Sequence, residues 1–102
     1  MKAVDFSAMA AQDLRDIAAH ISHDSPANAK SFSRELRARC AKIGVLPLAA
    51  RKVSGTRHDL RIVPYRSYII IYRIAESRVT VERIWHGSRD ISKLLALHFS
   101  ES

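Results

Sequence analysis

Cysteine, glycine and proline are all scarce in this chain. Its 102 residues include one cysteine, three glycines and three prolines. A single cysteine, Cys40, excludes an intramolecular disulfide and a zinc site built from clustered thiolates. So few glycines and prolines, in a sequence that is 47% hydrophobic, exclude the collagen-like, low-complexity and intrinsically disordered classes.

Long apolar runs are also missing. The longest uninterrupted run, at 68–72, has five residues, whereas a membrane-spanning helix needs about 20. The first residues contain Lys2 and then Asp5, without the apolar stretch of about 7–15 residues that a secretory signal requires. We therefore expect a cytoplasmic protein that has no membrane partner.

Acidic residues are few compared with basic ones. Ten aspartates and glutamates face 17 lysines and arginines, which leaves a net charge of +7 and a predicted pI of about 10.2. A field of this sign attracts polyanions, either nucleic acid or an acidic protein. The length fits one domain covering 1–102.

The N-terminal half predicts a strand and two helices. Short alternation over 2–6 indicates an edge strand, and Ser7 is a candidate cap for a helix over about 7–22. Ser25 followed by Pro26 repeats the start signal for a second helix that ends near 44–47. With about three residues between them, the two helices form an antiparallel hairpin. Each helix carries an apolar stripe: Ala10, Leu14, Ile17 and Ile21 in the first, and Ala29, Phe32, Leu36, Cys40 and Ile43 in the second.

The C-terminal half predicts an antiparallel meander of three strands, at 60–65, 68–74 and 79–85. The middle run is apolar on both faces, so we expect it at the centre of the sheet. Ser88 or Asp90 then caps a last short helix. That helix carries Ile91, Leu94, Leu95 and Phe99. The element order is β-α-α-β-β-β-α, an α+β fold.

Three arginines recur among the apolar residues of the sheet. Strand alternation groups Arg61 with Val63 and Tyr65, Arg73 with Ile69 and Ile71, and Arg83 with Val79, Val81 and Trp85. One interpretation is a basic concave surface on the side away from the hairpin, suited to phosphate or carboxylate. The other is a set of ion pairs on a solvated face, in which Arg73 and Arg83 pair with Glu76 or Glu82.

The stretch 84–90, Ile-Trp-His-Gly-Ser-Arg-Asp, is the most distinctive in the chain. His86 is a candidate general acid or base, because its ordinary pKa lies near neutrality. The alternative is a strand-to-helix corner in which His86 bonds to the backbone and Asp90 caps the helix or pairs with Arg89. The basic stretch 51–58 either contacts phosphates or is a solvated connection.

Metal binding is the weakest of the candidate chemistries. His20 and His23 stand near Asp24, but no second cluster supplies further ligands. We predict no metal site and no cofactor.

Element order and motifs together resemble the ParE/RelE toxin superfamily of bacterial type II toxin–antitoxin systems, nearer its ParE branch. Four stretches carry the resemblance: 11–14 with Ile17 and Ile21, 60–65, 68–73 and 81–90. The resemblance implies a helical hairpin packed on a curved antiparallel sheet. It also implies a growth-inhibiting toxin, neutralised in a hetero-oligomeric complex by a cognate ParD-like antitoxin with an acidic tail. We expect that tail to cover the sheet groove and part of the hairpin.

The two branches of the superfamily differ in their targets. ParE-like members are associated with poisoning of DNA gyrase, whereas RelE-like members cleave messenger RNA on the ribosome. For RNA cleavage this chain offers Arg61 and Arg83 as cations and His86 as base or acid. Gly87 follows His86, however, and the only later aromatic residue is Phe99, which departs from several RNase members.

The sequence therefore favours a non-enzymatic gyrase poison, with cleavage of messenger RNA as the alternative. The candidate residues for binding the target or the antitoxin are Arg61, Arg73, Arg83, Trp85, His86 and Arg89. Arg34, Arg37 and Arg39 on the hairpin form another candidate surface.

Overall fold

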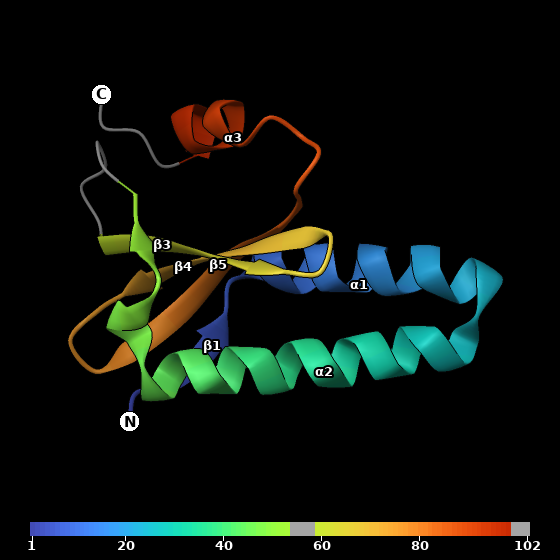
Figure 1. Cartoon of the computed structure of the whole chain (residues 1–102), viewed down its shortest axis with the longest axis horizontal. Helices are drawn as coiled ribbons and strands as arrows, with labels where there is room; N and C mark the ends of the chain where they lie inside the picture. The colour runs from blue at the N-terminus through green and yellow to red at the C-terminus, as the bar shows by residue number, and fades with distance from the viewer. Residues whose placement is uncertain (54–58, 99–102) are drawn as a thin grey trace.

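Two long helices form the predicted hairpin. The computed structural model describes residues 1–53 and 59–98, and within it α1 spans Ala8–Asp24 and α2 spans Pro26–Val45 (Figure 1). Each helix begins at a serine whose hydroxyl accepts a backbone N–H of the first turn: Ser7 at 3.0 Å and Ser25 at 3.2 Å. Both predicted caps are confirmed. No helix in the described part of the chain is long and apolar enough to cross a membrane.

The sheet has five strands in the order β1-β5-β4-β3-β2. Their bounds are Ala3–Phe6 (β1), Arg51–Lys52 (β2), Asp59–Tyr65 (β3), Tyr68–Ile74 (β4) and Arg78–His86 (β5). The predicted meander is confirmed, because β3, β4 and β5 pair antiparallel with β4 at the centre.

Two features of the sheet differ from the sequence prediction. β1 pairs parallel to β5, so the sheet is mixed rather than wholly antiparallel. After α2, a 3-10 turn (η1, Pro47–Ala49) leads into β2, which is added to the edge of β3. Residues 54–58 of the predicted basic loop lie outside the described part of the chain.

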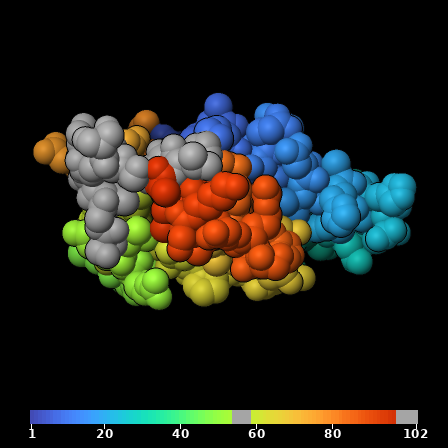
Figure 2. Space-filling model, turned by 90° about the horizontal axis from the view of Figure 1, so that it is seen from above, coloured from blue at the N-terminus to red at the C-terminus, as the bar shows by residue number. Residues whose placement is uncertain are grey.

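Helices cover both faces of the sheet. The hairpin lies on one face, over the main core, while α3 (Ile91–His98) lies on the other, where Leu94 packs with Leu60 and Ile71 (Figure 1). Figure 2 shows the C-terminal segment across the middle of that face. The predicted cap is confirmed at Asp90, whose side chain accepts the backbone N–H of Lys93 at 3.1 Å. α3 therefore covers part of the face on which one interpretation placed a basic concave surface.

A β-bulge changes the alternation of β5. Ile71 pairs with Arg83 and the next residue, Tyr72, pairs with Val81, so Glu82 is the extra residue. Before the bulge Val81 faces the hairpin core, whereas after it Arg83 lies opposite Ile71, on the α3 side. The predicted shared face of Val79, Val81, Arg83 and Trp85 is therefore wrong.

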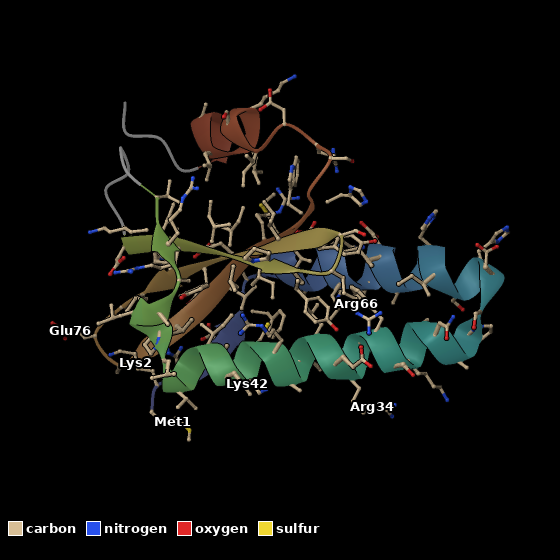
Figure 3. The ribbon with its side chains drawn as sticks, viewed as in Figure 1. Met1, Lys2, Arg34, Lys42, Arg66 and Glu76 are labelled. Atoms are coloured by element: carbon tan, nitrogen blue, oxygen red, sulfur yellow. The ribbon has the colours of Figure 1, made fainter. Side chains whose placement is uncertain are left out.

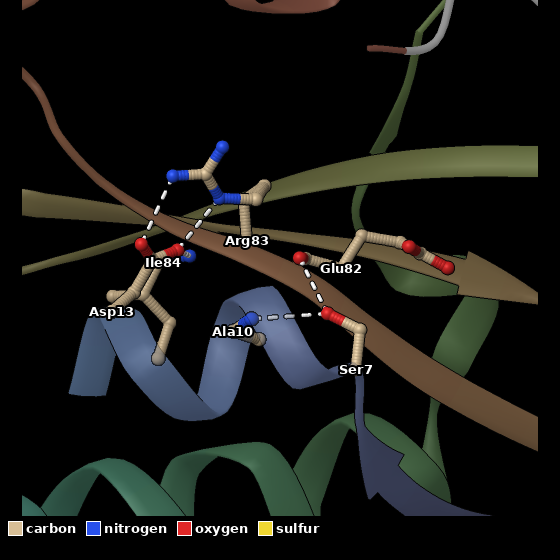
Figure 4. A network of polar contacts seen from close by, with 6 residues as sticks. All are labelled: Ser7, Ala10, Asp13, Glu82, Arg83 and Ile84. Atoms are coloured by element: carbon tan, nitrogen blue, oxygen red, sulfur yellow. Dashed lines mark hydrogen bonds and ion pairs between the residues drawn. The ribbon is translucent and has the colours of Figure 1, made fainter. Parts of the chain in front are cut away.

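The outer edge of β5 is held by α1 at the bulge. The Ser7 backbone N–H donates to the Val81 carbonyl at 2.9 Å, and its hydroxyl donates to the Glu82 carbonyl at 2.8 Å. Two residues further along β5, the Ile84 N–H donates to the Asp13 carboxylate at 2.9 Å (Figure 4). β1 ends at Phe6. Beyond it, groups at the start of α1 make the hydrogen bonds to β5 that a neighbouring strand would otherwise make.

A candidate interaction surface at the strand-to-helix corner

Arg83 is fixed by an ion pair with α1. Its Nε and one terminal nitrogen donate to the two oxygens of Asp13 at 2.7 and 2.9 Å, and both side chains are largely buried, at 11% and 15% exposure (Figure 4). This forked geometry is the strong form of an arginine–carboxylate contact. The Arg83 side chain therefore joins β5 to α1. The prediction that it pairs with Glu76 or Glu82 is wrong.

The other two sheet arginines are also paired. Arg73 contacts Glu82 at 3.3 Å, as the ion-pair interpretation predicted. Arg61 contacts Asp59 at 2.9 Å and also donates to the carbonyl oxygens of Leu48 and Ala50. Through these contacts Arg61 holds the backbone that follows α2 against β3.

The structure does not bring Arg61, Arg83 and His86 together. Arg61 lies level with Tyr72, and His86 lies level with Tyr68, which pairs with Tyr65. The four residues from Arg61 to Tyr65 correspond to about 13 Å along the strand. Arg61 also lies on the hairpin side of the sheet and Arg83 on the α3 side, so the three do not surround one reacting phosphate.

The remaining candidates lie at the end of β5, on its two faces: Trp85 is on the α3 side, whereas His86 lies opposite Tyr68, on the hairpin side. We call this end of the strand the corner and define it as Tyr68, Trp85, His86, Ser88 and Arg89. The Arg89 guanidinium lies 4.1 Å from the centre of the Trp85 ring, and that of Arg83 lies 5.1 Å from it. Arg89 is exposed and has no carboxylate partner among the described residues.

His86 is oriented by its neighbours in the corner. Its Nδ1 accepts the Ser88 backbone N–H at 3.1 Å and lies 2.6 Å from the Ser88 hydroxyl. Its ring stands edge-on to Tyr68 at 5.2 Å between centroids. The predicted bond from His86 to the backbone is therefore confirmed. With one ring nitrogen occupied, the exposed imidazole offers the other to a partner.

Gly87 allows the corner to approach the β3–β4 turn. Its N–H donates to the Ser67 carbonyl at 2.8 Å, and a Cβ at this position would lie 3.2 Å from the same oxygen. The turn itself places Arg66 at φ 55°, in the left-handed region. Sequence reasoning did not include Tyr68 in the site, although the pairing of the ends of two adjacent strands would place it beside His86.

The hairpin arginines do not form a single site. Arg34 is exposed, while the Arg37 guanidinium lies 5.4 Å from the Phe6 ring centre. Arg39 lines a pocket on the β3 side of α2. Close to the hairpin, Arg66 pairs with Glu35, which also accepts the Tyr65 hydroxyl.

Buried titratable groups lie away from the corner. Burial raises the pKa of the Cys40 thiol to about 11, against the opposing charges of Arg39 and Arg37. Burial likewise raises the pKa of Tyr72. Over residues 1–53 and 59–98 there is no group of three histidine, cysteine, aspartate or glutamate side chains arranged to hold a metal.

Comparison with known proteins identifies a family. A family model described as the ParE toxin of the type II toxin–antitoxin system parDE matches residues 4–91. A solved chain titled as the chromosomal ParDE TA system from P. aeruginosa superimposes with a TM-score of 0.70. The two chains are 18% identical, and the alignment covers 84% of this chain and 96% of that one. That likeness confirms the predicted fold, while no curated protein sequence matches the chain.

Proposed function

Because the chain belongs to the ParE toxin family of type II toxin–antitoxin systems, we propose that it inhibits bacterial growth by binding DNA gyrase and trapping its cleaved-DNA intermediate. A cognate antitoxin neutralises it in a hetero-oligomeric complex. Its place of action is the cytoplasm, where gyrase works.

The corner is the observation that supports a binding role. It presents an exposed guanidinium stacked on a half-buried indole and, on the other face of the strand, an oriented and exposed imidazole. Over residues 1–53 and 59–98, Arg89 has no ion-pair partner. Stacked arginine and tryptophan are typical of the centres of protein interfaces. A trapped enzyme–DNA intermediate needs such contacts and no chemistry from the toxin. We therefore propose Trp85, His86 and Arg89 as the residues that contact the target.

One of the three sheet arginines, Arg83, supports the corner. Arg83 lies against the Trp85 ring while Asp13 fixes its guanidinium. Arg61 and Arg73 are engaged in their own ion pairs. We propose that Arg83 positions the binding surface rather than contacts the target, whereas Arg61 and Arg73 stabilise parts of the fold away from the corner.

A supercoiling assay with purified gyrase, plasmid DNA and ATP tests the proposal. Folded protein is expected to abolish supercoiling and to accumulate linear DNA. Arg89→Glu is expected to weaken this effect about tenfold or more, because it removes an interface arginine. The matched control is Arg15→Glu, a change of the same charge on the exposed face of α1.

The alternative target gives a different result. A ribosome-dependent RNase leaves gyrase unaffected, cleaves messenger RNA on ribosomes and loses that cleavage in His86→Gln. Such a result would overturn the gyrase proposal. Gyrase inhibition that is weakened but not abolished in His86→Gln supports a binding mechanism, because loss of one contact lowers affinity without removing a catalytic step.

A further inference from the structure

Three basic side chains follow one side of α2. Lys30, Arg34 and Arg37 stand four and three residues apart, so they share one face of the helix, and all three are exposed. Figure 3 shows the Arg34 side chain on the side of α2 away from the sheet. At about 1.5 Å per residue the row is about 10.5 Å long. We call these three residues the α2 stripe.

The charges of the α2 stripe are not neutralised within the described part of the chain. None of the three residues forms an ion pair there. Glu35 is the acidic residue of α2, and its carboxylate pairs with Arg66 and accepts the Tyr65 hydroxyl. The Arg37 guanidinium lies over the Phe6 ring, a contact that leaves its N–H donors free to bind an anion. The stripe is therefore available to a negatively charged ligand.

The surface around the α2 stripe offers little apolar area. Over residues 10–44, all of which the structure describes, no large hydrophobic side chain is exposed. The exposed neighbours of the stripe on α2 include Ala27, Ala38 and Ala41. Protein interfaces bury large apolar and aromatic side chains at their centres. This surface suits a ligand that is recognised mainly through its charge.

An open groove between the two hairpin helices adjoins the stripe. It has a volume of about 480 Å³, and Lys30 lines it. The remaining lining residues are small: Ala18, Ala19, Ser22, Pro26, Ala29 and Ser33. Small side chains allow a sugar–phosphate backbone to approach the helices closely, and serine hydroxyls are among the donors that contact phosphate oxygens.

The turn between β3 and β4 connects the α2 stripe with the corner. On one side of the turn, the Gly87 N–H donates to the Ser67 carbonyl at 2.8 Å. On the other side, Arg66 pairs with Glu35, which is the neighbour of Arg34 in α2. The corner and the stripe therefore border the same turn. A partner that binds at the corner and carries DNA brings that DNA to the side of the molecule on which α2 lies.

We propose that the α2 stripe binds the phosphate backbone of duplex DNA. Its three cations pair with phosphates of one strand, which follow one another at about 3.4 Å along the duplex axis. Contacts to the backbone carry no sequence information, so binding is independent of sequence. The inference rests on the proposed function in one respect: the DNA that α2 contacts in the cell is the segment held by gyrase.

Fluorescence anisotropy tests the stripe with the full chain and a labelled DNA duplex of about 20 base pairs, without gyrase. Lys30→Gln combined with Arg34→Gln is expected to weaken binding about tenfold or more at about 0.1 M salt. The slope of log K against log salt concentration is expected to become shallower by about 2, because two phosphate contacts are lost. Arg37 is retained in this variant, since its contact with Phe6 also belongs to the fold.

A matched control comes from the other edge of the sheet. Arg51→Gln combined with Lys52→Gln removes the same charge from exposed residues of β2. This variant is expected to leave the salt slope unchanged within about 0.5. Two duplexes of unrelated sequence are expected to bind with affinities within about threefold of each other. For the unaltered protein, amide shifts on adding the duplex are expected at 27–38 and not at 51–52, which tests the location without a variant.

Several results would overturn the proposal. An equal loss of affinity in both charge-removal pairs would show that the duplex responds to net charge alone, and an unchanged affinity in the stripe variant would place the DNA elsewhere. If poly-glutamate binds through Lys30 and Arg34 while the duplex fails to bind, the stripe is a surface for an acidic protein. Poisoning of gyrase by a chain that does not bind the duplex refutes only this inference. Duplex binding through the stripe without any effect on gyrase refutes only the proposed target.

Discussion

Asp13 satisfies three donors with two oxygen atoms, two from Arg83 and one from the Ile84 backbone. Removing the carboxylate leaves a largely buried guanidinium and a strand N–H without partners. We therefore expect Asp13→Ala to lower the free energy of unfolding by about 3 kcal/mol. Urea denaturation of the variant and the parent protein measures the difference.

The Arg73–Glu82 pair is the comparison for this prediction. Arg73 is 40% exposed, so water screens its ion pair, and Arg73→Ala is expected to cost less than about 1 kcal/mol. A similar loss of stability in both variants would contradict the view that burial makes the Asp13 contact the stronger one.

Cys40 gives a prediction about reactivity. Burial raises its pKa from 9.0 to about 11, so the thiolate fraction at pH 8 is about a hundredfold below that of an unfolded thiol. Alkylation by N-ethylmaleimide is expected to slow by at least that factor in the native protein. Mass spectrometry of samples quenched over time, with and without urea, measures both rates. Equal rates would show that the thiol is accessible.

The same shift makes stability depend on pH. Because the folded pKa is the higher one, the unfolded chain loses its thiol proton first as the pH rises through 9.0. Stability from this group is therefore complete below pH 9 and falls between pH 9 and about 11, by about 1.4 kcal/mol per pH unit at the steepest. Urea midpoints are expected to fall less over this range in Cys40→Ala than in the parent protein. Parallel curves would contradict the assignment.

At the scale of elements, the sequence predicted those helices and strands whose formation depends on residues close together in the chain. Serine caps and apolar spacing gave both hairpin helices, and the apolar run at 68–74 gave the central strand. The β5 bulge was not predictable in this way, because the groups that hold it, Ser7 and Asp13, lie more than 65 residues away in the sequence. The direction of β1 and the presence of the two-residue β2 also depend on which strand each one pairs with, and the pattern of apolar residues does not reveal this.

Gly44 shows how closely α2 approaches β1. A Cβ at this position would lie 2.5 Å from the Lys2 carbonyl oxygen and 2.7 Å from a Val4 methyl group. Alanine in place of glycine normally stabilises a helix by about 1 kcal/mol. Here we expect Gly44→Ala to destabilise the protein by about 1–3 kcal/mol, because the backbone of Lys2 must move. Thermal unfolding measures the sign, and a raised melting temperature would contradict the predicted clash.

The candidate site was predictable only in part, for a related reason. The stretch at 84–90 singled out the corner from residue types alone. The structure places Arg89 on Trp85 and orients His86 on the other face of the strand. The roles of the sheet arginines depended on which acid each one meets: Asp13 from α1, Glu82 from the same sheet and Asp59 from the same strand. The sequence contains all three acids but does not show which arginine each of them meets in the fold.

At the scale of the whole molecule, the two cores differ greatly in size. The hairpin core draws on both long helices and four strands, whereas the α3 core has, among the side chains that the structure describes, Leu60, Ile71 and Leu94 as its buried members. A helix held by so few contacts is expected to detach locally before the molecule unfolds. The stability of the C-terminal segment is then partly independent of the stability of the rest.

Matched leucine substitutions test this independence. Leu94 is 2% exposed and Leu36 is 0% exposed, so truncation of either to alanine removes the same buried atoms, at a cost of about 2–5 kcal/mol. In Leu36→Ala this cost is expected to lower the global free energy of unfolding, because the hairpin core is shared by the whole fold. In Leu94→Ala the loss is expected mainly as faster amide exchange within α3, while amides of α1, α2 and β4 keep their protection. Hydrogen exchange followed by NMR distinguishes the two. If Leu94→Ala lowers protection uniformly, α3 unfolds together with the sheet, and the second core is part of one cooperative unit.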